Sequence, residues 1–328
     1  MIVEYLFLGL VGGITLDFLF GDLSNRYHPV AWLGRLIGFV VLKLKGNSSN
    51  NSSSKKEKEK GIIFAVLLII LFGLAIHFLA FMGLHLLGAI DLAIFSAIVL
   101  KITIAIKGME KHAMVIMSAL EGNDLPNARY NLSMIVRRDT KNLDTQYVLS
   151  GTIECIGESI VDGIVSPLFY YSFFGPAGAF IYRIINTLDS MVGYKDNYYK
   201  DIGWMSARLD TVANYIPARI TAFLMVISAK IIGSDWKSSI QILQRDHNKT
   251  ISPNAGYPMA TMAGALRIRL EKIGHYSIGD ECEPASLEKC KTAVSIMKLT
   301  TIIFCLIFAM PLMVILYLAG WWGLLFGL

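Results

Sequence analysis

Three acidic residues recur at a regular interval in an otherwise apolar stretch of this chain. Glu154, Glu158 and Asp162 stand four residues apart within IECIGESIVDGIVSPLFYY, residues 153–171. On an α-helix that spacing places all three carboxylates along one face. A carboxylate in a bilayer costs about 2.5–3.5 kcal/mol, and like charges one turn apart repel, so this face needs cations beside it. Either a network with Arg side chains or a bound Mg²⁺, which prefers hard oxygen ligands, would supply them.

A second concentration of polar residues suits phosphoryl chemistry. It lies in YRIINTLDSMVGY (182–194) and ARLD (207–210), and its members are Arg183, Asn186, Thr187, Asp189, Arg208 and Asp210. Guanidinium groups bind anionic oxygens, carboxylates hold a metal and amides donate hydrogen bonds, and phosphoryl transfer uses all three. The chain contains no Walker A, G-x-G-x-x-G or H-E-x-x-H motif, so no standard phosphate loop or zinc protease applies.

Three shorter polar stretches complete the candidates. Arg138 and Asp139 lie in IVRRDTKNLD, where a solvated helix end is the alternative to a functional role. Residues 252–254, Ser-Pro-Asn, have the features of a helix start. The small residues within 260–265 permit the close approach of either a large flat ligand or a second helix. The third stretch ends in His28, directly before a proline, which we interpret as an ordinary loop histidine.

The composition indicates a membrane protein. Hydrophobic residues make up 54% of the 328 residues and charged residues 17%, against about 25% charged in soluble domains. We therefore predict an all-α, multi-pass integral protein of the cytoplasmic cell membrane, a single domain over residues 1–328 with about 4–6 hydrophobic helices. The clearest expected spans are 2–20, 61–82, 84–106 and 300–318, the first of them a retained span and not a cleaved signal peptide. The net charge of +5 is spread over loops, which does not favour nucleic-acid binding.

The polar segments between these spans set the expected topology. The Lys- and Ser-rich segment 45–60 is predicted to be a disordered loop. The positive-inside rule places two longer polar regions, 107–152 and 234–295, on the cytoplasmic side. We expect helical structure in them, with a break at 123–126.

The chain between these two regions must then cross the membrane an even number of times. Pro167 and the pair Gly175-Pro176 interrupt it, which favours a broken or re-entrant element. Such backbone is stable only where protein or a water-filled cavity surrounds it.

Six motifs, in order along the chain, carry a resemblance. They are HPV (28–30), RDT (138–140), E-x-x-x-E-S-x-x-D-G (154–163), YR-x-x-NTLDSMVGY (182–194), ARLD-x-x-x-N-x-x-PAR (207–219) and SPNAGYP (252–258). With them the chain resembles the CobD/CbiB family, the adenosylcobinamide-phosphate synthases of cobalamin biosynthesis. It differs from the usual family pattern at Thr211 and Met259, where a carboxylate is more common.

The resemblance implies a membrane enzyme that forms an amide between a propionate of adenosylcobyric acid and aminopropanol or its phosphate, in an ATP-dependent ligation. An unactivated carboxylate does not condense with an amine in water, so the expected cofactors are ATP and Mg²⁺. Expected partners are these substrates, membrane lipid and other membrane-bound enzymes of the same pathway, and no nucleic acid.

The motif residues can be given roles in this reaction. Metal ligation is predicted for Glu154, Glu158, Asp162 and Asp189. Neutralisation of phosphate and carboxylate oxygens is predicted for Arg138, Arg183 and Arg208. Deprotonation of the amine is predicted for Asp139 or Asp210. Further cofactor and substrate contacts are predicted for Asn186, Thr187, Ser252 and Asn254.

Two other classes of function are compatible with the same features. A transporter of an anionic or corrinoid substrate would also carry charged residues in its spans and broken helices. The long polar motif regions and the lack of an internal repeat count against it. A scaffold for a membrane-bound biosynthetic complex would leave amide formation unchanged when the acids are lost.

Overall fold

The computed structural model describes residues 2–45, 51–194 and 196–327. Within these ranges the chain is mainly helical and has almost no strand. Five helical stretches are long and apolar enough to cross a membrane, and they are Ile2–Phe20, Ser54–Leu86, Ala89–Glu121, Thr145–Val192 and Leu287–Leu318. The pair Trp204–Ala213 and Tyr215–Ile231 passes the same test together, as a broken span. The prediction of an all-α, multi-pass membrane protein is confirmed.

By packing, the chain divides into two compact units. The first contains Met1–Ala105, Ser166–Ala213 and Ala309–Leu328, and the second contains Ile106–Val165 and Asn214–Phe308. Each unit is therefore assembled from segments that are far apart in the sequence.

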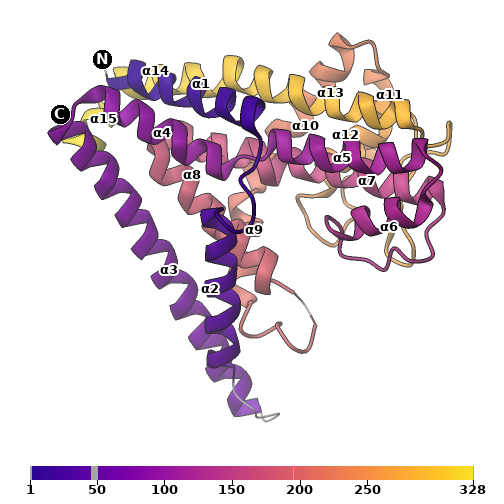
Figure 1. The fold of residues 1–328 in the computed structure, drawn as a ribbon, viewed down its shortest axis with the longest axis horizontal. Helices are drawn as coiled ribbons and strands as arrows, with labels where there is room; N and C mark the ends of the chain where they lie inside the picture. The colour runs from indigo at the N-terminus through magenta and orange to yellow at the C-terminus, as the bar shows by residue number, and fades with distance from the viewer. Residues whose placement is uncertain (1, 46–50, 195, 328) are drawn as a thin grey trace. The chain divides into compact units, whose positions relative to one another are not determined.

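The first unit is a helical bundle (Figure 1). Its helices are α1 (Ile2–Phe20), α2 (Pro29–Leu44), α3 (Asn51–Leu86), α4 (Ala89–Thr103), α8 (Ser166–Val192), α9 (Trp204–Ala213), α14 (Met310–Leu318) and α15 (Trp321–Phe326).

Helices α1 and α4 lie side by side at close range because glycines of α1 face the contact. A Cβ on Gly9 would lie 2.5 Å from the Ser96 Cβ, and one on Gly13 would lie 2.5 Å from the Leu100 Cβ. A pair of small residues four positions apart is the usual means of such close packing.

Helix α3 begins inside the segment that we expected to be a disordered loop. Residues 51–60 form its first turns, whereas residues 46–50 lie outside the described residues. Lys and Glu are good helix formers, and KKEKEK provides oppositely charged side chains one turn apart. The Lys58 Nζ lies 3.8 Å from the centre of the Trp204 ring, and Lys60 donates a hydrogen bond to the Leu44 carbonyl at 3.2 Å. Contacts with α9 and α2 therefore support these turns.

Helix α8 is broken at Gly175-Pro176, one of the two interruptions that the sequence predicted. Pro167, the other, is the second residue of α8 and does not break it, because a proline is tolerated in the first helical turn. Gly175 has φ 61° and ψ −150°, values outside the helical region, and Pro176 has no N–H to donate. The Trp321 indole N–H donates to the carbonyl of Phe173 at 2.7 Å, and the Tyr171 hydroxyl donates to the Leu6 carbonyl at 2.8 Å. These side chains fix the segment before the break against α15 and α1.

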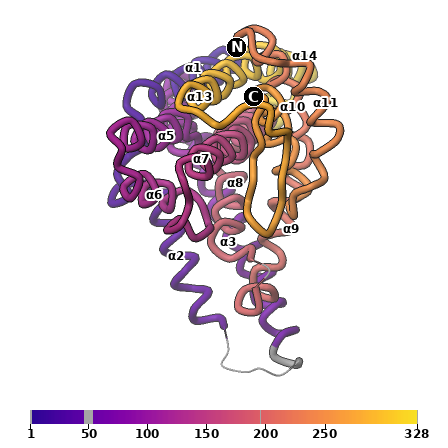
Figure 2. Tube along the Cα trace, turned by 90° about the vertical axis from the view of Figure 1, so that its right-hand side faces the viewer, coloured from indigo at the N-terminus to yellow at the C-terminus, as the bar shows by residue number. Residues whose placement is uncertain are grey.

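The second unit is also mainly helical (Figure 2). Its elements are α5 (Ile106–Glu121), α6 (Leu125–Ser133), α7 (Thr145–Ile160), the π-helical turn η1 (Val161–Val165), α10 (Tyr215–Ile231), α11 (Trp236–Asp246), α12 (Gly256–Leu266), β1 (Leu270–Lys272), β2 (Tyr276–Ile278) and α13 (Leu287–Phe304), followed by the π-helical turn η2 (Cys305–Ala309). The break expected at 123–126 is confirmed. The Asp124 Oδ1 accepts from the Asn127 N–H at 3.1 Å and so caps α6.

A short antiparallel hairpin, β1 and β2, is anchored on the end of α11. Leu270 pairs with Ile278, and the Gly279 N–H donates to the Asp246 Oδ2 at 2.8 Å. Asp246 is fully buried, and burial alone would raise its pKa. Hydrogen bonds from Arg245, Lys249 and the Gly279 amide outweigh burial and hold the pKa of that carboxyl well below its usual range.

We predict that Gly175→Ala destabilises the first unit. Its φ and ψ are accessible essentially to glycine alone, so alanine should reduce the free energy of unfolding by about 1–3 kcal/mol. Gly38→Ala is the matched control because that glycine lies inside α2, and its new Cβ would lie 3.6 Å from the Met191 Cε, an ordinary contact. The control should be neutral or stabilising by up to about 1 kcal/mol. Equal unfolding temperatures for the two variants in detergent would contradict this account of the break.

Candidate functional site

The three acids of the 153–171 stretch occupy three different environments. Glu154 and Glu158 lie on α7, whereas Asp162 lies in the π-helical turn η1. A π-helical turn is wider than an α-helical one, so the regular spacing holds between Glu154 and Glu158 but not as far as Asp162. Glu154 is buried, Asp162 is half-buried and Glu158 is exposed. The stacked row of three equivalent carboxylates expected from a regular helix is therefore interrupted.

Glu154 is held in what we term the Arg138 cluster, which consists of Arg138, Glu154, Glu271 and Tyr276. The Arg138 Nη2 lies 2.6 Å from the Glu154 Oε2, which is an ion-pair distance although the angle is not that of a hydrogen bond. The Tyr276 hydroxyl donates to the Glu154 Oε1 at 2.6 Å. The Arg138 Nη1 donates to the Glu271 carbonyl at 3.1 Å. This is the network of Arg and carboxylate that the sequence left as one of two alternatives.

Tyr276 was not predicted from the sequence. It is the first residue of β2, which pairs with β1, and its hydroxyl reaches Glu154 of α7 from there. Burial raises the pKa of its phenol, and the charge of Glu154 raises it further, as does that of the nearby Glu158. The phenol therefore stays protonated and acts as a hydrogen-bond donor. A lone tyrosine in a polar hairpin gives no signal of this role.

The predicted magnesium ligands remain a prediction. Among the described residues no group of three or more His, Cys, Asp or Glu side chains is placed to hold a metal. Mg²⁺ is usually bound by one or two carboxylates together with substrate phosphates, so a preformed cluster of three is not required. Glu158 and Asp162 carry carboxylates, which have the right chemistry for such ligands. Glu154 is paired with Arg138. Asp189 is half-buried on α8 and belongs to the first unit.

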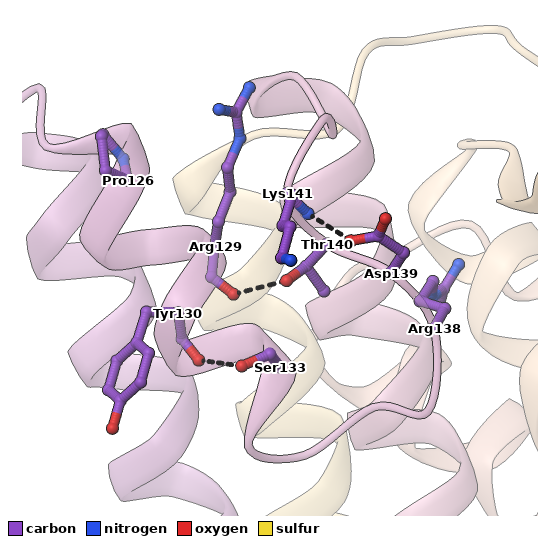
Figure 3. Close-up of a pocket in the computed structure, with 8 residues that line it drawn as sticks. All are labelled: Pro126, Arg129, Tyr130, Ser133, Arg138, Asp139, Thr140 and Lys141. Carbon is purple, nitrogen blue, oxygen red and sulfur yellow. Dashed lines mark hydrogen bonds between the residues drawn. The ribbon is translucent and has the colours of Figure 1, made fainter.

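A pocket of about 400 Å³ lies beside the RDT motif (Figure 3). Its lining residues come from α6 and the loop after it, and they are Pro126, Arg129, Tyr130, Ser133, Arg138, Asp139, Thr140 and Lys141. The wall is held by hydrogen bonds. The Thr140 hydroxyl donates to the Arg129 carbonyl at 2.9 Å, the Arg129 Nε donates to the Leu143 carbonyl at 2.6 Å, and the Asp139 Oδ1 accepts from the Lys141 N–H at 2.9 Å. With the charge of Arg138 balanced by Glu154, Arg129 and Lys141 outnumber Asp139, so the pocket is suited to an anionic group.

In the first unit, three predicted residues meet in what we term the Arg183 cluster, made of His28, Arg183, Asn186 and Asp210. The Arg183 Nη1 donates to the Asn186 Oδ1 at 3.2 Å, and the Asn186 Nδ2 donates to the Asp210 Oδ1 at 3.5 Å. Helices α8 and α9 are thereby joined through side chains of two motifs. His28 is placed beside this cluster by the packing of α2 along α8. A Cβ on Gly34 would lie 4.0 Å from the Thr187 Cγ2, and one on Gly38 would lie 3.6 Å from the Met191 Cε. The same register, continued one turn back, brings the start of α2 to Arg183, whose charge acts on His28.

The other predicted residues of the first unit lie as follows. The Thr187 hydroxyl donates to the Arg183 carbonyl of its own helix at 2.6 Å. Arg208 is exposed, with its guanidinium carbon 5.7 Å from the centre of the Trp204 ring. Neither contact excludes a binding role, and both predictions stand.

Lys101 is a functional candidate that the sequence analysis missed. It is buried in α4, where its Nζ donates to the Gly21 carbonyl and lies 4.0 Å from the Asp17 Oδ1. A charged residue inside an expected span was the available signal. The contact fixes the chain where it leaves α1 and turns toward His28.

Helix α12 begins within the SPNAGYP stretch, at Gly256, two residues after the Ser-Pro-Asn that was predicted to start it, and none of the described side chains caps it. The Ser252 Oγ accepts from the Asn254 N–H at 3.3 Å, and the Asn254 Oδ1 accepts from Arg219 at 3.4 Å. The Arg219 guanidinium carbon also lies 3.5 Å from the centre of the Tyr215 ring. Of the two uses proposed for the small residues that follow, helix packing is observed, since a Cβ on Gly264 would lie 2.6 Å from the Ser239 Cα of α11.

The fold and these clusters define the class: a multi-pass α-helical membrane protein whose buried guanidinium and carboxylate groups are paired inside it. The family model described as CobD/Cbib protein matches residues 10–319. The chain belongs to this family.

Three relatives show how closely the chain follows the family. The probable cobalamin biosynthesis protein CobD of Methanothermobacter thermautotrophicus is 40% identical over 93% of this chain and 98% of its own. The cobalamin biosynthesis protein CobD of Dehalococcoides mccartyi is 39% identical over 83% and 86%. The probable cobalamin biosynthesis protein CobD of Thermoplasma volcanium is 37% identical over 93% and 97%. No solved structure matches the chain.

We predict that Arg138→Gln strongly destabilises the second unit. The pair is buried, with 11% and 9% of the two side chains exposed, and removing one partner of a buried pair costs about 3–5 kcal/mol because the other charge stays unpaired. The double variant Arg138→Gln/Glu154→Gln should regain part of this loss in a thermal unfolding measurement. Arg137→Gln is the control, since Arg137 is exposed. A double variant no more stable than the single one would show that the pair is not coupled.

Proposed function

We propose that this chain is an enzyme of cobalamin biosynthesis that joins a propionate of adenosylcobyric acid to the amino group of aminopropanol or its phosphate. It would be an acid–amine ligase. The observation that carries the proposal is the family match over residues 10–319, together with relatives named for cobalamin biosynthesis that are similar over nearly their whole length. The regions 107–152 and 234–295, which contribute Arg138, Glu271 and Tyr276 of the Arg138 cluster, would face the cytoplasm.

The chemistry requires activation of a carboxylate. ATP, carried with Mg²⁺, would transfer its terminal phosphoryl group to a propionate oxygen and leave as ADP. The amine would then displace phosphate, together with that oxygen, from the carbonyl carbon as the C–N bond forms. The incoming ammonium must lose a proton before this attack, which is the task of a general base.

The pocket beside the RDT motif supports a place for the amine substrate. Asp139 would bind the ammonium group and take its proton, while Arg129 and Lys141 would balance a phosphate on the other end of a short amino-alcohol phosphate. A volume of about 400 Å³ is suited to a small ligand. Ser252 and Asn254 would contact the corrinoid.

The Arg183 cluster supports binding of anionic oxygens in the first unit. Arg183 and Arg208 would neutralise the nucleotide phosphates and the propionate. Asn186 and Thr187 would add polar contacts, and Asp210 is the alternative base. Glu158, Asp162 and Asp189 remain the predicted metal ligands, because each carries a carboxylate of the kind that Mg²⁺ prefers.

We expect isolated membranes containing the protein to form the amide from adenosylcobyric acid, aminopropanol phosphate and Mg-ATP, as detected by mass spectrometry. Glu158→Ala and Asp189→Ala should each lower kcat/KM about 10–100-fold, as loss of metal-site residues commonly does. Glu121→Ala is the control, because Glu121 is an exposed acid that pairs with Lys291 at 3.4 Å.

Three other results would each reject part of the proposal. Near-normal product from both variants would reject the metal ligands. Uptake of corrinoid into proteoliposomes without ATP turnover would favour the transporter. Failure of the wild type to form the amide would reject the ligase.

A further inference from the structure

His28 ends the chain segment between α1 and α2 and caps the second of these helices. Its Nδ1 accepts a hydrogen bond from the Val30 N–H at 3.2 Å. An imidazole nitrogen that accepts a hydrogen bond carries no proton. In the neutral ring the proton must therefore be on Nε2, which makes Nε2 a donor.

The surroundings of His28 keep the ring neutral. Burial lowers its pKa, and Asp22, in the same loop, opposes this effect. Arg183 of α8 and Lys101 of α4 lower the pKa further because their positive charges disfavour a second cation. At neutral pH the side chain thus provides one acceptor, used by the cap, and one N–H donor.

The cap itself gives no reason for a histidine at this position. Capping needs only an acceptor, and Asn, Asp and Ser supply it best. Among the residues that the structure describes, no hydrogen bond involves Nε2 of His28, and this atom is not one of the fully buried polar atoms without a partner. The ring therefore carries an accessible donor beyond what the fold uses, and the packing of Gly34 and Gly38 of α2 against Thr187 and Met191 of α8 places it beside Arg183.

We propose that His28 is a substrate-binding residue, whose Nε2–H donates a hydrogen bond to an anionic oxygen bound at the Arg183 cluster. This inference rests on the proposed function, which supplies two sources of such an oxygen, the carboxylate of the acid and the phosphates of the other two substrates. A neutral N–H donor beside a guanidinium binds an anion without adding a charge that must itself be neutralised in an apolar surrounding.

Two substitutions separate this role from capping. His28→Asn keeps an acceptor near the position of Nδ1 and has no group at the position of Nε2. His28→Gln places an amide N–H near the position of Nε2, but glutamine is a poorer cap. A purely structural His28 predicts that stability and activity fall together and that Asn is the better replacement. A substrate-binding His28 predicts the opposite order for activity.

The experiment measures unfolding temperature and substrate kinetics for the wild type and both variants in detergent. We expect His28→Asn to unfold like the wild type and to lose about 10–100-fold in kcat/KM, the size of one hydrogen bond to a charged group. His28→Gln should be less stable and yet more active than His28→Asn. The substrate whose KM rises identifies the oxygen: adenosylcobyric acid for the carboxylate, aminopropanol phosphate or Mg-ATP for a phosphate.

A second measurement keeps the inference independent of turnover. The rise in unfolding temperature caused by each of the three substrates is measured separately for the wild type and His28→Asn. Loss of the rise for one substrate supports the proposal even if the wild type forms no amide, a result that rejects the ligase alone. Three results would each overturn the role of His28. They are unchanged kinetics in His28→Asn, a rise in unfolding temperature that is the same in His28→Asn as in the wild type for every substrate, and no rise with any substrate in the wild type.

Discussion

A polar group inside an apolar helical bundle must find its partner within the protein, because lipid offers none. The first unit meets this constraint at Lys101, which reaches back across the contact between α1 and α4 to the Gly21 carbonyl and Asp17. The close approach of these helices, permitted by Gly9 and Gly13, makes that reach possible. Gly21 directly follows α1 and leads into the loop that carries His28. The buried contact of Lys101 with Gly21 and Asp17 therefore positions the start of α2 and its cap.

The sequence was most informative where structure depends on local chemistry. Helix breaks at Gly175-Pro176 and near Asn123 follow from residues that cannot continue a helix, and both were predictable. The same local reasoning was insufficient at 51–60, where composition suggested disorder and contacts with α2 and α9 accompany a helix. Tyr276 shows the further limit. Its contact with Glu154 joins residues 122 positions apart, and no periodicity encodes that distance.

Spacing arguments also assume one type of helix throughout. The regular interval from Glu154 to Asp162 predicts a uniform acidic face, but η1 changes the winding before Asp162 is reached. The result is a separation of environments: one carboxylate is buried against a guanidinium, one is exposed and one is intermediate. Carboxylates in different environments can serve different purposes. A structural role for Glu154 is therefore compatible with a ligand role for its neighbours.

The buried pair of Arg138 and Glu154 needs an explanation other than stability. Replacing such a pair by well-packed apolar residues is often neutral or stabilising. The pair therefore contributes little to the free energy of unfolding compared with apolar side chains. What the pair does accomplish is geometric. Arg138 is directly followed by Asp139 and Thr140, which line the pocket, and the Thr140 hydroxyl ties this loop to α6 at 2.9 Å. Arg138 contacts both Glu154 of α7 and Glu271 of the hairpin, and these contacts fix the position of the loop that lines the pocket. A guanidinium can do this because it presents several donors in a rigid plane. An apolar side chain would fill the same volume without fixing where Asp139 stands.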